Sequence, residues 1–132
     1  MLEKLEIITQ RKVDLIDITS QIKDVIVKSG VQAGICIIFV PHTTAGVTIN
    51  ENADPDVIRD IIESINKIVP FDAIYKHSEG NSPAHIKSSL FSPDHTLIIE
   101  NGALSLGVWQ GIYFCEFDGP RNRKLFVKVL GG

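Results

Sequence analysis

The stretch VPHTTAGVTINENADPD, residues 40–56, gathers polar and ionisable side chains between two regular apolar segments. The apolar run before it, residues 34–40, is typical of a buried strand, and Pro41 ends that strand because proline offers no N–H to the ladder. Residues 47–50 alternate like a second strand, and the Asp54–Pro55 pair is a helix start. The stretch therefore predicts a strand–loop–strand–helix corner that carries an imidazole, hydroxyls, amides and carboxylates.

The first half of the chain continues this pattern on both sides of the corner. A strand is expected over residues 2–9, and an amphipathic helix from Thr19 or Ser20 to a stop at Gly30. The clearest helix starts at Asp54, its N-cap, and ends before Pro70. Its apolar stripe has the spacing of a helix laid on a sheet and comprises Val57, Ile58, Ile61, Ile62, Ile65 and Ile68.

The second half predicts a polar loop, a short helix and three strands. Residues 72–82 contain few apolar side chains and are typical of a binding loop, and Ser82–Pro83 caps a helix over residues 84–90. Strands are expected over residues 96–100, 108–117 and 124–130, with a tight Asn101–Gly102 turn after the first and the second as the central strand. The sum is an α+β domain of roughly six or seven mostly antiparallel strands with two to three helices.

Composition limits what the chain can be and what it can bind. Its 132 residues predict one domain, 1–132, and 13 basic against 16 acidic residues give no positive field for nucleic acid. Charged residues at 22% are sparse for a small monomer, which suggests that a partner covers part of the surface. The charged N-terminal residues lack an uninterrupted apolar run, so we expect neither a signal peptide nor a membrane anchor there. Both cysteines lie in apolar runs, so we expect a reduced, cytoplasmic protein.

Three histidines stand in loops or at helix ends and are the first candidates for chemistry. His42 follows the first strand of the corner, His77 lies in the polar loop, and His85 lies in the first turn of the short helix. Imidazoles in such places serve as metal ligands, as general acids or bases, or as hydrogen-bond donors to a phosphate. Their spacing matches no tight zinc motif, so surface or structural histidines remain the alternative. His95, in a turn, is expected to be structural or exposed.

The run GNSPAHIK, residues 80–87, has features of an anion site. A glycine before a capped helix start presents backbone N–H groups, and His85 and Lys87 add positive charge beside them. An ordinary helix cap explains the same pattern.

Carboxylates and an arginine suggest further ligand contacts. Glu51 is favoured over Asp54 as a magnesium ligand or base, because Asp54 has a structural duty as a helix cap. Glu116 either points outward or sits at a cavity rim with Trp109 and Gln110. Arg121 either clamps a phosphate or pairs with a surface acid.

Three motifs together resemble one family over essentially the full length. PHTTAGVTINENADPDV (41–57), HSEGNSPAHIKSSL (77–90) and LGVWQGIYFCEFDGPRNR (106–123) are similar to the YjbQ family, which is associated with a secondary thiamine-phosphate synthase activity. Two positions depart from the family pattern. Ser92 replaces a usual glycine in a turn, and Val108 replaces a frequent threonine, which removes a hydroxyl near the expected pocket.

The resemblance implies a two-sheet sandwich, a homotrimer and a histidine-lined pocket in a cytoplasmic protein. The implied reaction joins hydroxymethylpyrimidine diphosphate to a thiazole phosphate and releases diphosphate. The implied catalytic residues are His42, His77, His85 and Glu51, and the three histidines are also the candidate metal ligands. The implied substrate-binding residues are Asn50, Asn81, Ser82, Lys87, Trp109, Gln110, Glu116 and Arg121.

The leading hypothesis is therefore a transferase acting on a small phosphorylated substrate. In it Glu51 holds Mg²⁺, Lys87, Arg121 and the helix start at Ser82 bind phosphate, and one histidine acts as acid to the leaving group. Coordination of zinc by all three histidines would instead indicate a metal-dependent hydrolase or lyase. A non-catalytic, phosphate-binding trimer is the third hypothesis.

Overall fold

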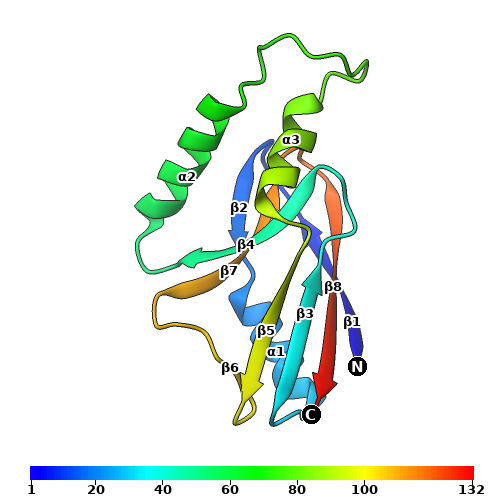
Figure 1. Cartoon of the computed structure of the whole chain (residues 1–132), viewed down its shortest axis with the longest axis vertical. Helices are drawn as coiled ribbons and strands as arrows, with labels where there is room; N and C mark the ends of the chain where they lie inside the picture. Colours follow the sequence, from blue (N-terminus) through cyan, green and yellow to red (C-terminus); the bar gives the residue numbers. More distant parts are fainter.

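Two antiparallel sheets and three helices make up the computed structural model, which describes all residues from 1 to 132 (Figure 1). The larger sheet has five strands in the order β1-β8-β3-β5-β6, and the smaller has three in the order β2-β7-β4. The five are β1 (Leu2–Ile8), β3 (Gly34–Phe39), β5 (Asp94–Glu100), β6 (Ala103–Leu104) and β8 (Asn122–Gly131). The three are β2 (Asp14–Asp17), β4 (Ala45–Glu51) and β7 (Gln110–Glu116).

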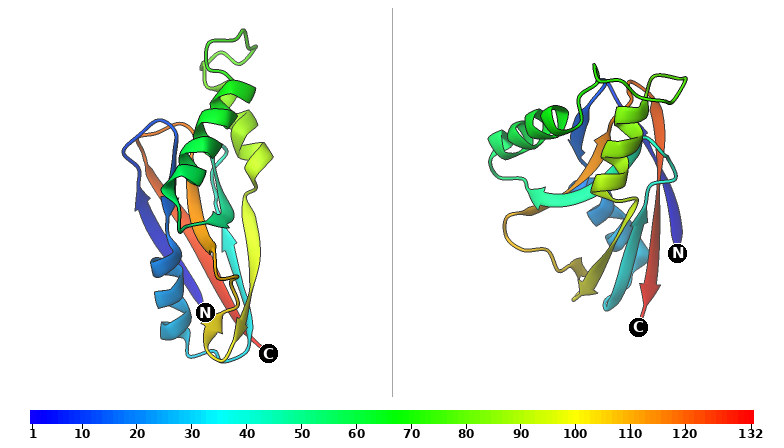
Figure 2. Two further views of the ribbon diagram at one scale, coloured as in Figure 1. Left: turned by 90° about the vertical axis from the view of Figure 1, so that its left-hand side faces the viewer. Right: turned by 45° about the horizontal axis from the view of Figure 1, so that its top comes forward.

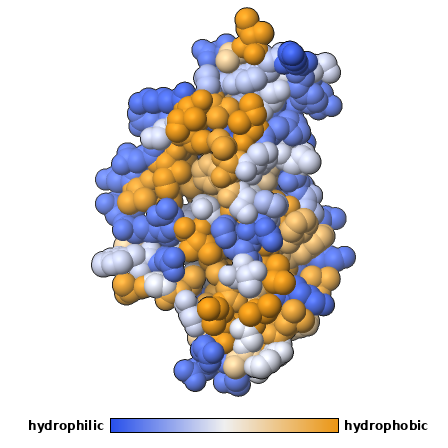
Figure 3. All heavy atoms as spheres, viewed as in Figure 1, coloured by the Kyte–Doolittle hydropathy of each residue, from blue (hydrophilic) through white to orange (hydrophobic).

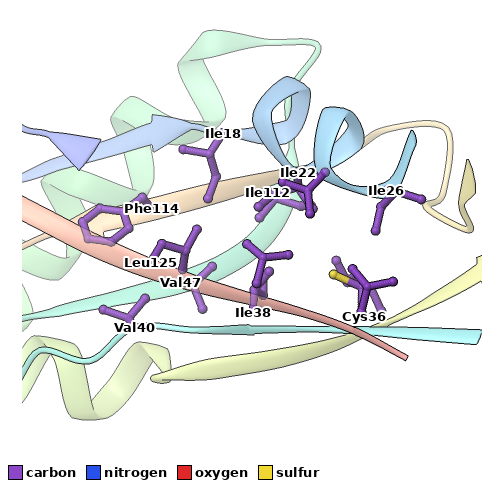
Figure 4. Close-up of a cluster of buried hydrophobic side chains, with 14 of the residues drawn as sticks. Ile18, Ile22, Ile26, Cys36, Ile38, Val40, Val47, Ile112, Phe114 and Leu125 are labelled. Carbon is purple, nitrogen blue, oxygen red and sulfur yellow. The ribbon is translucent and has the colours of Figure 1, made fainter. Parts of the chain in front are cut away.

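The core lies between the two sheets and is closed by the first helix, α1 (Thr19–Ser29). Figure 4 shows Ile22 and Ile26 of α1 pointing toward Cys36 and Ile38 of β3. Phe114 of β7, like these four side chains, is almost completely excluded from solvent. The two-residue period of the strands and the helical spacing in α1 thus direct these side chains into one large apolar cluster, beside which a smaller cluster includes Leu15, Tyr113 and Phe117.

The α1 helix begins and ends for different local reasons. Its start is held by Asp17, whose Oδ1 accepts from both the N–H and the hydroxyl of Thr19. The predicted capping by Thr19 or Ser20 is therefore wrong, because the helix already includes both residues and an acid two positions earlier supplies the acceptor. The predicted stop is confirmed, since Gly30 has the left-handed φ of 70°.

The helix α2 (Pro55–Ile68) forms where its cap signal predicts, but it lies at the side of the molecule (Figure 2). Asp54 accepts from the N–H of Asp56, as an N-cap should. Of the predicted inner stripe only Ile65 is buried, and Ile68 is 70% exposed. Ile58, Ile61 and Ile62 are partly buried and pack against the smaller apolar cluster that includes Leu15 of β2 and Tyr113 of β7. The predicted packing of this helix on a sheet is therefore confirmed for the middle of the stripe, whereas its end at Ile68 remains uncovered in the isolated chain.

The remaining helix, α3 (Ser82–Phe91), stands beside β4 and faces the loop that follows β3. The hydroxyl of Ser88 donates to the carbonyl oxygen of Thr43 at 2.6 Å, which ties this helix to that loop. No helix of the protein combines the length and apolar character needed to cross a bilayer.

The predicted α+β class, the antiparallel pairing and the third helix are confirmed, as is the central place of β7 in its sheet. Two strands escaped the sequence analysis. β2 is only four residues long and β6 only two, so neither is long enough to show an alternating pattern. Asn101 and Gly102 both have positive φ, as the predicted tight turn between β5 and β6 requires.

Gly46 offers a test of how closely β4 approaches the segment before β5. A Cβ at Gly46 would lie 2.8 Å from the backbone oxygen of Ser92, the oxygen to which Val47 donates. We expect Gly46→Ala to lower the free energy of unfolding by about 1–3 kcal/mol because backbone must shift. Gly131→Ala is the control in urea titrations, since its Cβ would meet nothing closer than 3.8 Å. Equal stability of the two variants would contradict the close approach.

Candidate functional site

His85 on α3 stands between two neighbouring pockets of about 330 Å³ each. One pocket also contains His42, and the other also contains His77. The rings of His77 and His85 pack edge to face with centroids 5.3 Å apart. The structure thus brings together, around one turn of helix, three imidazoles that lie far apart in the sequence.

The other lining groups are mostly hydroxyls, and neither pocket wall contains a carboxylate. The His42 pocket is lined by His42, Thr43, Ala45, His85, Ser88, Ser89 and Pro93. The His77 pocket is lined by Tyr75, Lys76, His77, Ser82, His85 and Ile86. Ser88 and Ser89 were not predicted, although they follow His85 at i+3 and i+4 and so share its helix face.

His42 is held by the backbone of β8. The N–H of Lys124 donates to His42 Nε2 at 2.9 Å. Burial lowers the pKa of His42 below its ordinary value, and the positive charge of Arg123 lowers it further. His42 is therefore a neutral imidazole at neutral pH.

Asp118 fixes two of the predicted ligand-binding residues. Its carboxylate accepts from Asn81 and from Arg121, each at 3.0 Å, and its carbonyl oxygen accepts from the Arg121 Nε–H. Burial alone would raise the pKa of Asp118, but the bonds from Asn81 and Arg121 outweigh burial and leave the pKa below its ordinary value. Arg121 therefore has an ionised acid as its partner and keeps about half of its side chain exposed toward solvent.

The start of α3 offers less to an anion than the sequence predicted. Pro83 has no N–H, and the N–H groups of Ala84 and His85 both donate to the carbonyl oxygen of Asn81. Ser82 lines the His77 pocket, so its hydroxyl and backbone N–H are the remaining donors of this helix end.

Lys87 does not belong to the site, contrary to the prediction. Its side chain is fully buried, donates to Asn66 Oδ1 at 2.5 Å and lies over the ring of Phe71 at 3.7 Å. Burial, with the charge of Lys12 as a smaller cause, lowers the pKa of Lys87 to about 8. The helical period explains the error, because position 87 lies on the face of α3 that points away from His85.

Glu116 is also wrongly predicted as a substrate contact. It is 0% exposed and pairs with the buried guanidinium of Arg123, while the Thr9 hydroxyl donates to its Oε1 at 2.6 Å. Burial would raise the pKa of Glu116, yet the bonds from Arg123 and Thr9 outweigh it and leave the pKa low. Strand alternation does not decide which way the Glu116 side chain points. At the end of β7 this side chain points into the interior, toward β8.

Four further predicted residues lie at the opposite end of β4 from His42. Glu51 pairs with Gln110 across β4 and β7, and the N–H of Asn52 donates to the carbonyl oxygen of Trp109. The strand from Ala45 to Glu51 separates the two ends by roughly 20 Å at 3.3 Å per residue. Within one chain, Asn50, Glu51, Trp109 and Gln110 therefore do not share a site with the histidines.

A metal centre does not fit the residues of the single chain. No group of three or more His, Cys, Asp or Glu side chains lies close enough together to hold an ion. The acceptor nitrogen of His42 is already used by Lys124, and the Glu79 carboxylate lies 3.9 Å from His77 Nε2, beyond hydrogen-bond distance. The predicted ligand set of His42, His77 and His85 is thus not assembled here, and Glu51, the predicted magnesium ligand, lies at the far end of β4.

Cysteine chemistry does not contribute to the site. Cys36 and Cys115 are both free and buried, as predicted, and burial raises the pKa of the Cys36 thiol to about 11. Burial likewise raises the pKa of Cys115. Neither thiol is an accessible nucleophile.

A family model described as UPF0047 protein YjbQ-like matches residues 3–132 of the chain. Among curated proteins, UPF0047 protein MJ1081 of Methanocaldococcus jannaschii is 53% identical over 131 residues, covering 99% of this chain and 95% of that protein. UPF0047 protein YugU of Bacillus subtilis is 47% identical over 132 residues, covering 99% of this chain and 100% of that protein.

Solved structures agree with the fold. A crystal structure of a YjbQ/UPF0047 family protein from Clostridium acetobutylicum superposes with a TM-score of 0.95 at 55% identity, covering 97% of this chain and 99% of that one. A YbjQ-like protein of unknown function from Sulfolobus solfataricus gives a TM-score of 0.96 at 32% identity, covering 100% of this chain and 97% of that one. The names of these relatives state a family and no activity.

The neutral state of His42 has a consequence for stability. The unfolded chain binds a proton at this residue more readily than the folded chain, because the folded pKa lies below the ordinary 6.5. The stability contributed by neutral His42 is present above that value and is lost as the pH falls through the folded pKa. Urea titrations from about pH 7.5 to about pH 5.5 should show this loss. In His42→Gln, whose amide oxygen can accept from Lys124, the loss should shrink; an unchanged pH dependence would contradict the assignment.

Proposed function

The chain belongs to the UPF0047 (YjbQ-like) family, and on that premise we propose that its histidine pockets bind a phosphorylated small molecule and catalyse a transferase reaction. The proposed activity is that of a thiamine-phosphate synthase. It joins hydroxymethylpyrimidine diphosphate to a thiazole phosphate and releases diphosphate. The observation that carries the proposal is the pair of carboxylate-free pockets that share His85.

The chemistry of the pocket walls supports an anionic ligand. The imidazoles, the hydroxyls of Thr43 and Ser82 and the ammonium of Lys76 can donate hydrogen bonds to phosphate oxygens, whereas the Ser88 and Ser89 hydroxyls already donate to backbone carbonyl oxygens. A carboxylate in the wall would repel such a ligand, and neither wall contains one. Two pockets of about 330 Å³ each also match a reaction with two phosphorylated substrates.

In the proposed reaction, the protein acts chiefly by electrostatic stabilisation of the transition state. The thiazole nitrogen supplies the electron pair for the new C–N bond, and the bond between the methylene carbon and the diphosphate oxygen breaks. The diphosphate leaves with that electron pair, so negative charge develops on its oxygens. Positive or donating groups placed at those oxygens stabilise the transition state.

His85 is the residue placed to serve both substrates, because it borders both pockets. As an imidazolium it donates a proton to the leaving diphosphate. Arg121 lies close enough for its charge to help lower the pKa of His42, and it offers its free N–H groups to phosphate. No step of the reaction passes through a metal ion held by the single chain, because no three candidate ligands lie close enough together to hold one.

The cytoplasm is the proposed location of this reaction. Cys36 and Cys115 are free and lie in different parts of the core, so the fold carries no disulfide. Free, buried thiols are typical of proteins in reducing compartments.

Substitution of His85 tests the proposal directly. We expect His85→Ala to lower the rate of thiamine-phosphate formation at least about 100-fold, because general acid catalysis is worth that much. The rate is measured as diphosphate release from the two phosphorylated precursors, with unfolding followed in parallel. The matched control is His95→Gln, because the His95 side chain bonds to the carbonyl oxygen of Val47 and lines neither pocket.

Full activity in His85→Ala would end the transferase proposal. Hydrolysis of the diphosphate without joining, dependent on added zinc, would favour the metal-dependent hydrolase or lyase. Calorimetric binding of the precursors without turnover would favour a non-catalytic binding protein.

We also propose that the chain acts as a homotrimer in which each site is completed by the next copy. Hydrophobic residues cover much of the surface between α2 and α3 in Figure 3. Ile68 of α2 is 70% exposed and Leu90 of α3 is 60% exposed. At the far end of β4, Trp109 is 62% exposed beside Glu51 and Gln110. A head-to-tail interface would cover such apolar surfaces and bring the Glu51 end of one copy to the histidines of another.

Mixing of inactive variants tests this arrangement. His85→Ala and Glu51→Gln should each be inactive alone, whereas jointly refolded protein should regain activity at about a quarter of its sites by random assortment. Native mass spectrometry reports whether trimers form and whether they are mixed. Mixed trimers without recovered activity would place the whole site within one copy, and a monomeric wild type would end the assembly proposal.

A further inference from the structure

The end of β3 leaves a backbone N–H of β8 without a backbone acceptor beside the site. β3 pairs with β8 up to Phe39, which faces Phe126. The N–H groups along one edge of a strand recur every second residue, so the next donor of β8 on this edge belongs to Lys124. The chain has already left the sheet at Pro41, and His42 Nε2 takes the place of the missing backbone acceptor at 2.9 Å.

This bond decides where the proton of His42 sits. A backbone N–H can only donate, so Nε2 must be the unprotonated nitrogen of the ring. The proton of the neutral imidazole is therefore on Nδ1. No protein group bonds to Nδ1, and this nitrogen is not enclosed.

A buried network holds both ends of this bond. Arg123, the residue before Lys124, donates to Glu116 and to the hydroxyl and the carbonyl oxygen of Thr44. Thr44 lies two residues after His42, and its carbonyl oxygen also accepts from the N–H of Phe117. The Glu116–Arg123 pair is thus bonded to the loop of His42 and adjoins its backbone partner on β8.

We propose that the Glu116–Arg123 pair positions His42 as a neutral donor that presents Nδ1–H to an oxyanion of the ligand in the His42 pocket. Glu116 and Arg123 are positioning residues in this scheme, because both are buried and neither lines the pocket. His42 is the ligand-contacting group.

The proposal separates the roles of the histidines around the pocket. A ring that already carries its proton on Nδ1 neither accepts a proton there nor binds a cation there. His42 therefore supplies a fixed hydrogen bond to a phosphate oxygen, and proton transfer belongs to His85. This assignment goes beyond the proposed reaction, because any phosphate ligand in the His42 pocket would meet the same donor.

The wild-type protein tests the first step without any substitution. Long-range ¹H–¹⁵N correlation spectra of the histidine rings report which nitrogen carries the proton, with His42→Gln identifying the signals. We expect a single tautomer of His42 with the proton on Nδ1, and a shift of its Nδ1–H signal on titration with inorganic phosphate. A ring protonated on Nε2, or a mixture of tautomers, would overturn the proposal. An Nδ1–H signal that phosphate does not move would overturn the ligand contact.

Two variants test the positioning role. Arg123→Lys keeps a cation but loses the forked contact to Glu116 and Thr44, and Thr44→Val removes only the hydroxyl acceptor. Each should give a mixture of His42 tautomers and a several-fold weaker phosphate affinity, while Arg59→Lys on the exposed face of α2 should change neither. If Arg123→Lys does not fold, Thr44→Val decides alone. A His42 ring that keeps one tautomer in every folded variant would overturn the positioning role.

The spectroscopic result does not depend on turnover. If the protein showed no thiamine-phosphate synthase activity, the expected single tautomer of His42 would still be observed. If the spectra showed a mixture of His42 tautomers, the effect of His85→Ala on the synthase rate would still decide the transferase proposal. The two proposals therefore fail in distinguishable ways.

Discussion

The ion pair between Glu116 and Arg123 joins the two sheets at a point where no water can solvate either charge. Glu116 ends β7 of the smaller sheet, and Arg123 lies near the start of β8 in the larger one. Burying two charges costs several kcal/mol per ion unless hydrogen bonds satisfy them. Here the Thr9 hydroxyl and the N–H of Asp118 donate further hydrogen bonds to the Glu116 carboxylate, and the Thr44 hydroxyl accepts one from the Arg123 guanidinium. The pair therefore fixes one geometry for the segments that meet around it.

Those segments are the ones that form the candidate site. The loop after β3 carries His42, the turn after β7 carries Asp118 and Arg121, and β8 supplies the N–H that holds His42. The hydrogen bond from the Ser88 hydroxyl to the carbonyl oxygen of Thr43 holds α3 against the loop after β3. A rigid, buried polar network thus lies beneath an accessible pocket wall of imidazoles and hydroxyls, the arrangement that a preorganised binding site requires.

The proposed assembly would explain both the uncovered apolar surface and the separation of the functional motifs. The stripe of α2 has the sequence pattern of a buried face, yet in one chain only Ile65 is fully buried and Ile68 is 70% exposed. The Asn50–Glu51 and Trp109–Gln110 segments gather at the end of β4 remote from the histidines. In the proposed trimer, a second copy would account for both features, because a heterologous interface joins two different surfaces of the same chain.

Much of this protein follows from the sequence alone, for local reasons. The Asp54–Pro55 start of α2, the stop at Gly30 and the turn at Asn101–Gly102 are set by backbone preferences of single residues. The family follows from three long motifs, and His42, His77 and His85 were identifiable as candidates because polar side chains interrupted apolar runs.

The direction of each side chain was decided only by the tertiary structure. Lys87 and Glu116 have the chemistry of ligand-binding residues, but helix phase and the end of β7 turn them into the interior. The convergence of His42 with His85, the division between the two ends of β4 and the proton position on His42 all depend on contacts between distant segments. Local sequence patterns specify periodicity and caps, whereas burial and hydrogen-bond partners arise only when the two sheets pack.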